Sequence, residues 1–245
     1  MTRRSWLGAL AVALLALGAA DARAMTLGDT NLVGLLREAE AIVVGQVQGV
    51  TDGVDAAGIP YTEITLDVAD SIRGGLSGTY TFRQFGLLEP RLTADGTKKM
   101  MPAPSGFPRY AEGEDVVLFL YKQAEWTGLR TTVGLAHGKF TLGPGRVENT
   151  VANQGLFENV SMLDGLATEN DQRMLATEFG AVNPDTFLSF VRRAVENSWV
   201  EGGRMWNTDE GRPGGPMRVP DRVSTRNRTG RSTQRFDRKA EGAQP

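Results

Sequence analysis

The chain contains one histidine, His137, and no cysteine, so few of its side chains could act as a nucleophile or a general base. A catalytic histidine needs a nucleophile to activate, or a carboxylate to orient it, within hydrogen-bond reach. The sequence neighbours of His137 are Ala136 and Gly138, and the chain has no Gly-x-Ser-x-Gly motif. We therefore expect His137 to be a structural residue in a strand within 128–142.

An acidic group, Glu112, Glu114 and Asp115, precedes a strongly apolar segment. Such carboxylates could hold a hard cation or form a glycosidase-type pair, with His137 close by. A single histidine cannot supply the two or more imidazoles of the common zinc sites, and the absence of cysteine excludes thiol chemistry. We expect a solvated turn here, with no metal and no cofactor. A carboxylate-dependent hydrolase is the alternative.

The segment 86–113 interrupts the alternating pattern on either side of it and is rich in proline and glycine. Loops longer than about 15 residues in a compact domain are usually functional or disordered. This loop combines basic, flexible and aromatic side chains, which suit contact with a partner. We expect its binding residues to be Arg91, Lys98, Lys99, Met100, Met101, Phe107, Arg109 and Tyr110. The alternative is a loop that only packs over the mouth of a barrel.

Alternation of apolar and polar residues predicts several closely spaced β-strands. The continuous apolar run of 115–122 predicts a strand buried on both faces. Gly45 and Gly49, inside the first strand, predict bulges or tight coiling. The expected strands are 41–50, 61–75, 78–85, 115–122, 128–142 and 145–151.

Helices are expected at both ends of the strand-rich part. Asp29 is the expected N-cap of an amphipathic helix that begins near Leu32. Thr168 begins a capping-box pattern, and Asn183 followed by Pro184 is a further helix start. These elements predict a mainly β fold, a small OB-like antiparallel β-barrel flanked by an N-terminal helix and C-terminal helices.

Residues 1–24 have the basic start, apolar core and small terminal residues of a Sec-type signal peptide, with cleavage expected after Ala24. No later segment is apolar for long enough to span a bilayer, so we expect a periplasmic or secreted protein that is not transmembrane. The domain is expected to occupy 25–201, where 23 Asp and Glu outnumber 14 Lys and Arg.

The remaining segment, 202–245, has 10 Lys and Arg against 5 Asp and Glu and no apolar periodicity, which predicts a disordered basic tail. Outside the cytoplasm, an anionic envelope surface or an acidic protein is a better partner for such a tail than nucleic acid. A tail whose arginines serve solubility alone is the alternative.

Three short segments resemble an exported bacterial module and the netrin-type OB barrel of tissue inhibitors of metalloproteinases. They are AEAIVVGQV (39–47), IRG (72–74) and EGEDVVLFL (112–120). The resemblance covers about residues 39–142 and implies a barrel used as a binding scaffold. In those inhibitors a free amino-terminal cysteine chelates the protease zinc. This chain has no cysteine, so that chemistry carries over to none of its residues.

The sequence therefore favours a non-enzymatic binding module with another exported protein as partner, such as a partner or modulator of an extracytoplasmic protease. A carboxylate-dependent hydrolase and a structural envelope component remain the two alternatives.

Overall fold

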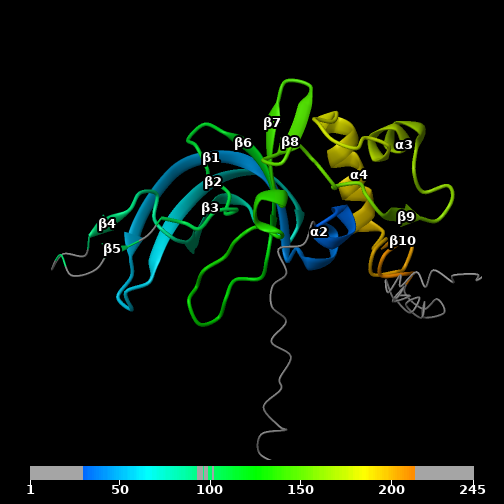
Figure 1. Ribbon diagram of the computed structural model, residues 1–245. Coiled ribbons are helices and arrows are strands. Elements are labelled where there is room, and N and C mark those ends of the chain that lie inside the picture. Colours follow the sequence, from blue (N-terminus) through cyan, green and yellow to red (C-terminus); the bar gives the residue numbers. More distant parts are fainter. Residues whose placement is uncertain (1–29, 93–95, 97–98, 101, 213–245) are drawn as a thin grey trace, which may run out of the picture. The chain divides into compact units, whose positions relative to one another are not determined.

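The computed structural model describes residues 30–92, 96, 99–100 and 102–212 (Figure 1). The expected signal peptide, residues 1–24, lies outside the described residues, as do Lys98, Met101 and residues 213–245 of the expected tail. Within the described ranges, no helix combines the length and the apolar character needed to cross a membrane.

A six-stranded antiparallel sheet with the strand order β3-β2-β1-β6-β7-β8 forms the centre of the fold. Its strands are β1 (Ala41–Val54), β2 (Pro60–Arg73), β3 (Gly78–Phe85), β6 (Asp115–Leu120), β7 (Lys139–Gly143) and β8 (Arg146–Asn149). Two small sheets accompany it, β4 (Arg91–Leu92) with β5 (Lys99–Met100), and β9 (Val160–Met162) with β10 (Met205–Asn207). The expected mainly β class with flanking helices is confirmed.

The sheet buries both of its faces at β6, each against a separate hydrophobic core. Alternate residues of a strand point to opposite faces, and β6 divides accordingly. Its Val116, Leu118 and Leu120 belong to the inner core, whereas Val117 and Phe119 belong to the core shared with the helices. All five are fully buried, which confirms that this apolar run is a strand covered on both sides.

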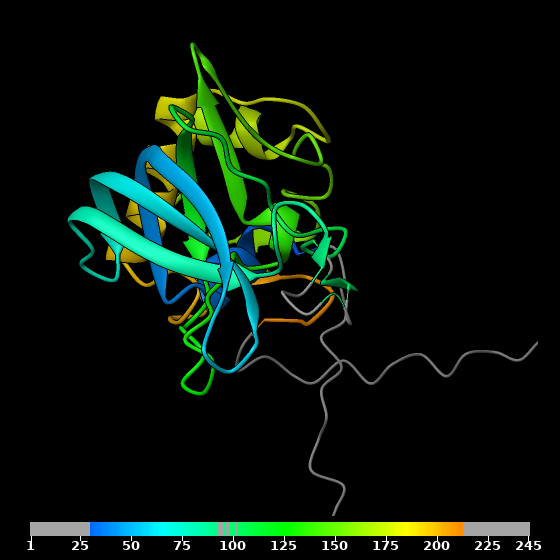
Figure 2. The same cartoon turned by 90° about the vertical axis from the view of Figure 1, so that its left-hand side faces the viewer.

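Strand β1 curves strongly in both views (Figures 1 and 2), and its glycines mark the irregular positions. The register with β2 shifts between Val44 and Gly45 and again between Val47 and Gly49, as expected for bulges. A Cβ atom at Gly45 would lie 2.4 Å from the Asp67 carbonyl oxygen, so only glycine lets the two backbones come this close. The expected role of these glycines is confirmed.

The segment 129–132 forms isolated β-bridges to two strands of the sheet, β3 and β6. Arg83 of β3 forms a parallel bridge with Leu129, and Leu120 of β6 forms an antiparallel bridge with Thr132. The segment 129–132 thus lies between β3 and β6, but it contributes bridges rather than a ladder. Closure into an OB-like barrel therefore stays a prediction.

Three helices cover the outer face of the sheet: α2 (Leu32–Glu38), α3 (Glu169–Leu175) and α4 (Pro184–Glu196). Thr168 and Asp171 form the expected capping box of α3, and Asn183 caps α4 through the Thr186 amide. In α4, Phe187 packs against Phe140 with ring centroids 5.0 Å apart. Figure 1 shows α3 and α4 beyond β7 and β8, on the side away from β4 and β5.

Three local expectations were wrong. Helix α2 is capped by Asn31, whose side chain accepts the Gly34 amide, and not by Asp29, which lies outside the described residues. Residues 128–142 do not form one strand, because the 3-10 helix η1 (Leu135–His137) interrupts them. Folded structure continues past residue 201, since the Met205 side chain of β10 is fully buried.

Candidate functional site

The loop 86–113 is attached to β2 at its start and then folds back on itself. The Gly86 amide donates a hydrogen bond to the Pro60 carbonyl (3.0 Å), and the Ala103 amide donates to the Leu87 carbonyl (2.9 Å). Leu87 is 1% exposed, so its side chain anchors the start of the loop in the core. Gly86 has φ +101°, and a Cβ atom there would lie 2.3 Å from the Ala103 Cα atom. Glycine is therefore required where the loop crosses itself.

Asp52, near the end of β1, holds the first part of the loop. Its carboxylate accepts a hydrogen bond from the Leu88 amide (2.8 Å) and forms an ion pair with Arg91. Burial alone would raise the pKa of Asp52, but the hydrogen bonds from Arg91 and Leu88 outweigh it and hold the pKa below its usual range. Arg91, expected to contact a partner, thus has a partner within the chain and positions the loop.

A hollow of about 330 Å³ opens between the loop and the inner face of the sheet. Gln84 lines it and is 3% exposed. The Gln84 amide nitrogen donates to the Pro108 carbonyl (2.9 Å), and its amide oxygen is buried without a hydrogen-bond partner in the described residues. Phe107, Arg109 and Tyr110 also line this hollow, so three of the expected binding residues do lie together.

Tyr110 belongs to the inner core more than to the surface. Its ring meets the Phe82 ring edge-on, with centroids 5.9 Å apart, and the Lys139 ammonium lies 5.3 Å from its centroid. Its hydroxyl is buried and has no hydrogen-bond partner in the described residues. Burial, together with the Glu114 carboxylate, raises the pKa of the Tyr110 phenol well above its usual value. We assign Tyr110 to packing beneath the loop.

Large apolar side chains are exposed around the same end of the sheet. Val54 ends β1, Phe85 ends β3, and Leu88 and Leu92 lie in the loop that follows. Their exposed fractions run from 38% for Leu88 to 63% for Leu92. Arg109 adds an exposed cation that forms no ion pair within the described residues. We call these five residues, Val54, Phe85, Leu88, Leu92 and Arg109, the loop surface.

Of the other expected binding residues, two belong to a short strand and two lie outside the described residues. Lys99 and Met100 form β5, which pairs with β4 in antiparallel register, Leu92 with Lys99 and Arg91 with Met100. Lys98 and Met101 lie outside the described residues.

Four residues of the loop surface were missed, as was the role of Asp52. Phe85 carried a usable signal, because it is an apolar residue at the last position of the expected strand 78–85, just before the loop. Val54 lay beyond the end of the expected strand 41–50. Leu88 and Leu92 lay within the expected loop, but their exposure depends on the path of its backbone.

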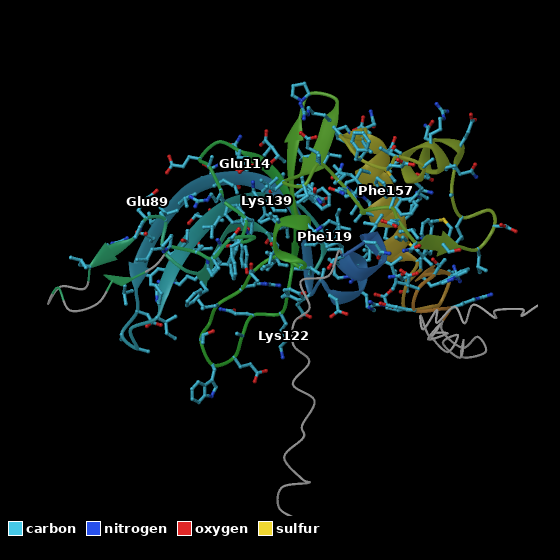
Figure 3. The ribbon with its side chains drawn as sticks, viewed as in Figure 1. Glu89, Glu114, Phe119, Lys122, Lys139 and Phe157 are labelled. Atoms are coloured by element: carbon cyan, nitrogen blue, oxygen red, sulfur yellow. The ribbon has the colours of Figure 1, made fainter. Side chains whose placement is uncertain are left out.

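The acidic turn is exposed at Glu112 and Asp115, as expected, but Glu114 forms a largely buried ion pair. The Glu114 carboxylate pairs with the Lys139 ammonium, and the side chains are 15% and 6% exposed. It also accepts hydrogen bonds from the Thr141 hydroxyl (2.6 Å) and the Ala111 amide (3.2 Å). Figure 3 shows Glu114 and Lys139 close together above the centre of the sheet. This carboxylate ties β7 to the segment that precedes β6.

His137 lies in η1, where its Nδ1–H donates to the Gly134 carbonyl (3.1 Å). A carbonyl oxygen only accepts, so this contact places a proton on Nδ1. Within the described ranges, no group of three or more His, Asp or Glu side chains is arranged to hold a metal ion.

Two further surface features fall outside the loop. Trp126, in the loop that joins β6 to η1, is 99% exposed. A groove of about 690 Å³ lies between the segments 151–158 and 175–179, which include the end of α3.

The chain matches no protein-family model, no curated protein and no solved structure.

Proposed function

We propose that the chain is an exported, non-enzymatic binding module whose loop surface holds another exported protein. The observation that carries this proposal is the exposure of four large apolar side chains around one end of the sheet. They lie beside a hollow and beside Arg109, which forms no ion pair with the part of the chain that the structure describes. Monomeric proteins seldom gather such side chains without an interaction to cover them. Apolar residues with arginine at their edge are typical of protein interfaces.

The loop surface is also held in place before any partner binds. Asp52 fixes Leu88 and Arg91, and the Gly86 and Ala103 contacts fix the first part of the loop. A preformed surface loses less conformational entropy on binding, which favours affinity.

The hydrolase alternative receives less support. The Glu114 carboxylate is already engaged by Lys139, Thr141 and Ala111, so it would have to break a buried ion pair before it could act as a base.

The proposal also includes two more specific points. The chain is exported, and its partner is a protease or a regulator of one. Export is supported by the signal-like residues 1–24, and the choice of partner by the resemblance to netrin-type barrels. That resemblance and the role of a tail at an anionic envelope surface stay predictions.

Site-specific photocrosslinking in the producing cell tests the proposal. A photoreactive phenylalanine analogue is placed at Leu88 or Leu92 of the full chain, with Thr81 as the control position. Thr81 lies on β3 away from the loop and is exposed. We expect one defined protein adduct from positions 88 and 92 and none from position 81. Absence of an adduct, or an equal adduct from position 81, would contradict a partner at the loop surface.

A further inference from the structure

A second hollow of the described residues, a groove, lies far from the loop surface. It runs between the segments 151–158 and 175–179 and encloses about 690 Å³. Figure 3 shows Phe157, which lines this groove, on the helical side of the sheet. Glu89, in the loop 86–113, is on the other side, with Phe119 between them. A ligand in the groove would therefore leave the loop surface free.

Buried hydrogen bonds hold the two walls of the groove together at its base. Asn153 is fully buried, and its side-chain amide donates to the carbonyls of Val147 (3.1 Å) and Gly180 (2.9 Å). The Gly180 amide returns a hydrogen bond to the Ala152 carbonyl (2.6 Å). Ala152 and Asn153 have φ of +52° and +56°, a region that alanine rarely adopts.

This strained backbone persists because the surrounding hydrogen bonds determine its path, which is typical of a site shaped for a ligand. These hydrogen bonds thus fix the walls of the groove, and binding requires little rearrangement of them.

The lining combines apolar walls with negative charge at the edge. Phe157 and Leu175 contribute apolar surface inside, and Phe179 is 71% exposed at the edge. Glu158 and Glu178 are the charged residues of the lining, and neither forms an ion pair within the described residues. No lysine, arginine or histidine lines the groove.

Both glutamates lie at one groove whose lining supplies no counter-charge. Three exposed carboxylates of this part of the chain have arginine partners, in the pairs Arg37–Glu210, Arg73–Glu201 and Arg173–Glu169. A ligand that supplies a cation between apolar walls would complete the same arrangement. The aromatic rings of Phe157 and Phe179 favour a guanidinium or ammonium group as well.

We propose that this groove binds a cationic segment of a second protein, in which an arginine or lysine stands beside an apolar residue. The polar groups lie at the exposed edge and the apolar ones inside, which is the arrangement of a protein interface. A small-molecule pocket places its polar groups deep inside, where they fix the orientation of the ligand. With this groove and the loop surface, the chain contacts two proteins at once.

Peptide titration on the full chain tests this assignment. The probe is an acetylated octapeptide, Gly-Ser-Arg-Leu-Arg-Phe-Ser-Gly, followed by calorimetry and by amide NMR shifts. We expect shifts confined to 150–158 and 175–180, with an affinity that weakens as salt is added. A peptide with glutamate in place of both arginines, and one with serine in place of leucine and phenylalanine, should each bind at least tenfold more weakly.

Matched variants separate the groove from general charge. The double variant Glu158→Gln/Glu178→Gln should lose at least tenfold in affinity, whereas Glu112→Gln/Glu196→Gln removes the same charge elsewhere and should stay within twofold. All four side chains are on exposed residues, so the variants should fold. Equal binding by both double variants, equal binding of the glutamate peptide, shifts outside the groove, or no shift at millimolar peptide would each overturn the proposal.

Discussion

Asp52 and Asp171 each hold two segments of the chain together through one carboxylate. Asp52 joins the end of β1 to the loop, and Asp171 joins α3 to Arg193 of α4. Hydrogen bonds to a charged group contribute more than those between neutral groups, and they lose their value when the group is protonated or removed. The two aspartates therefore have measurable and separable consequences.

Replacement of Asp52 is expected to loosen the start of the loop. Asp52→Ala removes the acceptor of the Leu88 amide and the ion pair with Arg91, at a cost of about 1–2 kcal/mol in the free energy of unfolding. Urea denaturation followed by circular dichroism measures this difference. The control, Asp67→Ala, removes an exposed carboxylate of β2 and should cost under about 0.5 kcal/mol. Equal losses for both variants would show that Asp52 has no special role.

Asp171 makes stability depend on pH at the acidic end. Burial would raise its pKa, but hydrogen bonds from Arg193 and Thr168 outweigh this and lower it. A carboxyl whose pKa is lower in the folded state stabilises the fold above its unfolded pKa, and this contribution is lost as pH falls through the folded pKa.

The stability difference between the wild type and Asp171→Asn should therefore be constant above about pH 5 and shrink below about pH 4. At neutral pH we expect about 2–3 kcal/mol, because the Asp171 side chain is 2% exposed and charged hydrogen bonds are lost. Urea denaturation at pH 7 and pH 3 measures both values. A difference that does not change with pH would contradict the role of the charge.

Among the elements, the loop 86–113 depends on a backbone crossing that only glycine permits. Gly86→Ala places a Cβ atom against the backbone of Ala103 at a left-handed φ. We expect a loss of about 3 kcal/mol or more, since a left-handed residue alone costs roughly 1–2 kcal/mol and the clash adds to it. Limited proteolysis should then cleave within 86–113 before any other described segment.

Gly58→Ala is the matched control for Gly86→Ala. Gly58 has a similar left-handed φ of +80°, but a Cβ atom there meets nothing within 4 Å. Its cost should stay near 1 kcal/mol, the value for conformation alone. If both variants lose the same stability, the contact with Ala103 does not hold the loop.

Elements with a clear residue period could be predicted from the sequence, and shorter ones could not. The alternation in β2 and β3 and the capping residues of α3 and α4 are local signals, so these elements appear where expected. Strands of two or three residues, such as β4 and β9, have no measurable period. The 3-10 helix at His137 follows from Gly134, whose left-handed backbone ends the preceding extended segment.

At the scale of the whole molecule, segments far apart in sequence form the two surfaces. Composition alone marked the loop 86–113, because prolines, glycines and basic residues are visible without a fold. The groove could not be predicted, because it needs Asn153 to bring 151–158 against 175–180. The expected domain boundary failed for the same reason, since a three-residue strand packs only where its distant partner β9 lies.

The end of the folded part is tested by truncation. A chain of residues 25–212 keeps β10, whereas a chain of residues 25–201 loses its pairing with β9 and the fully buried Met205 side chain. We expect the shorter chain to be less stable by about 3 kcal/mol, the usual cost of an emptied buried site. Thermal unfolding of the two chains measures the difference. Equal melting temperatures would show that the folded domain ends at residue 201.

The full exposure of Trp126 gives the protein an intrinsic optical reporter. The chain of residues 25–212 lacks Trp6, and of its three tryptophans Trp199 is 3% exposed and Trp206 is partly buried. In this chain dissolved iodide should quench the emission of Trp126 first. Trp126→Phe should abolish most of that quenching while leaving the unfolding midpoint unchanged. Any molecule that covers the loop between β6 and η1 would then shift the Trp126 emission to shorter wavelength and reduce its quenching by iodide. No label on the chain is needed to detect this binding.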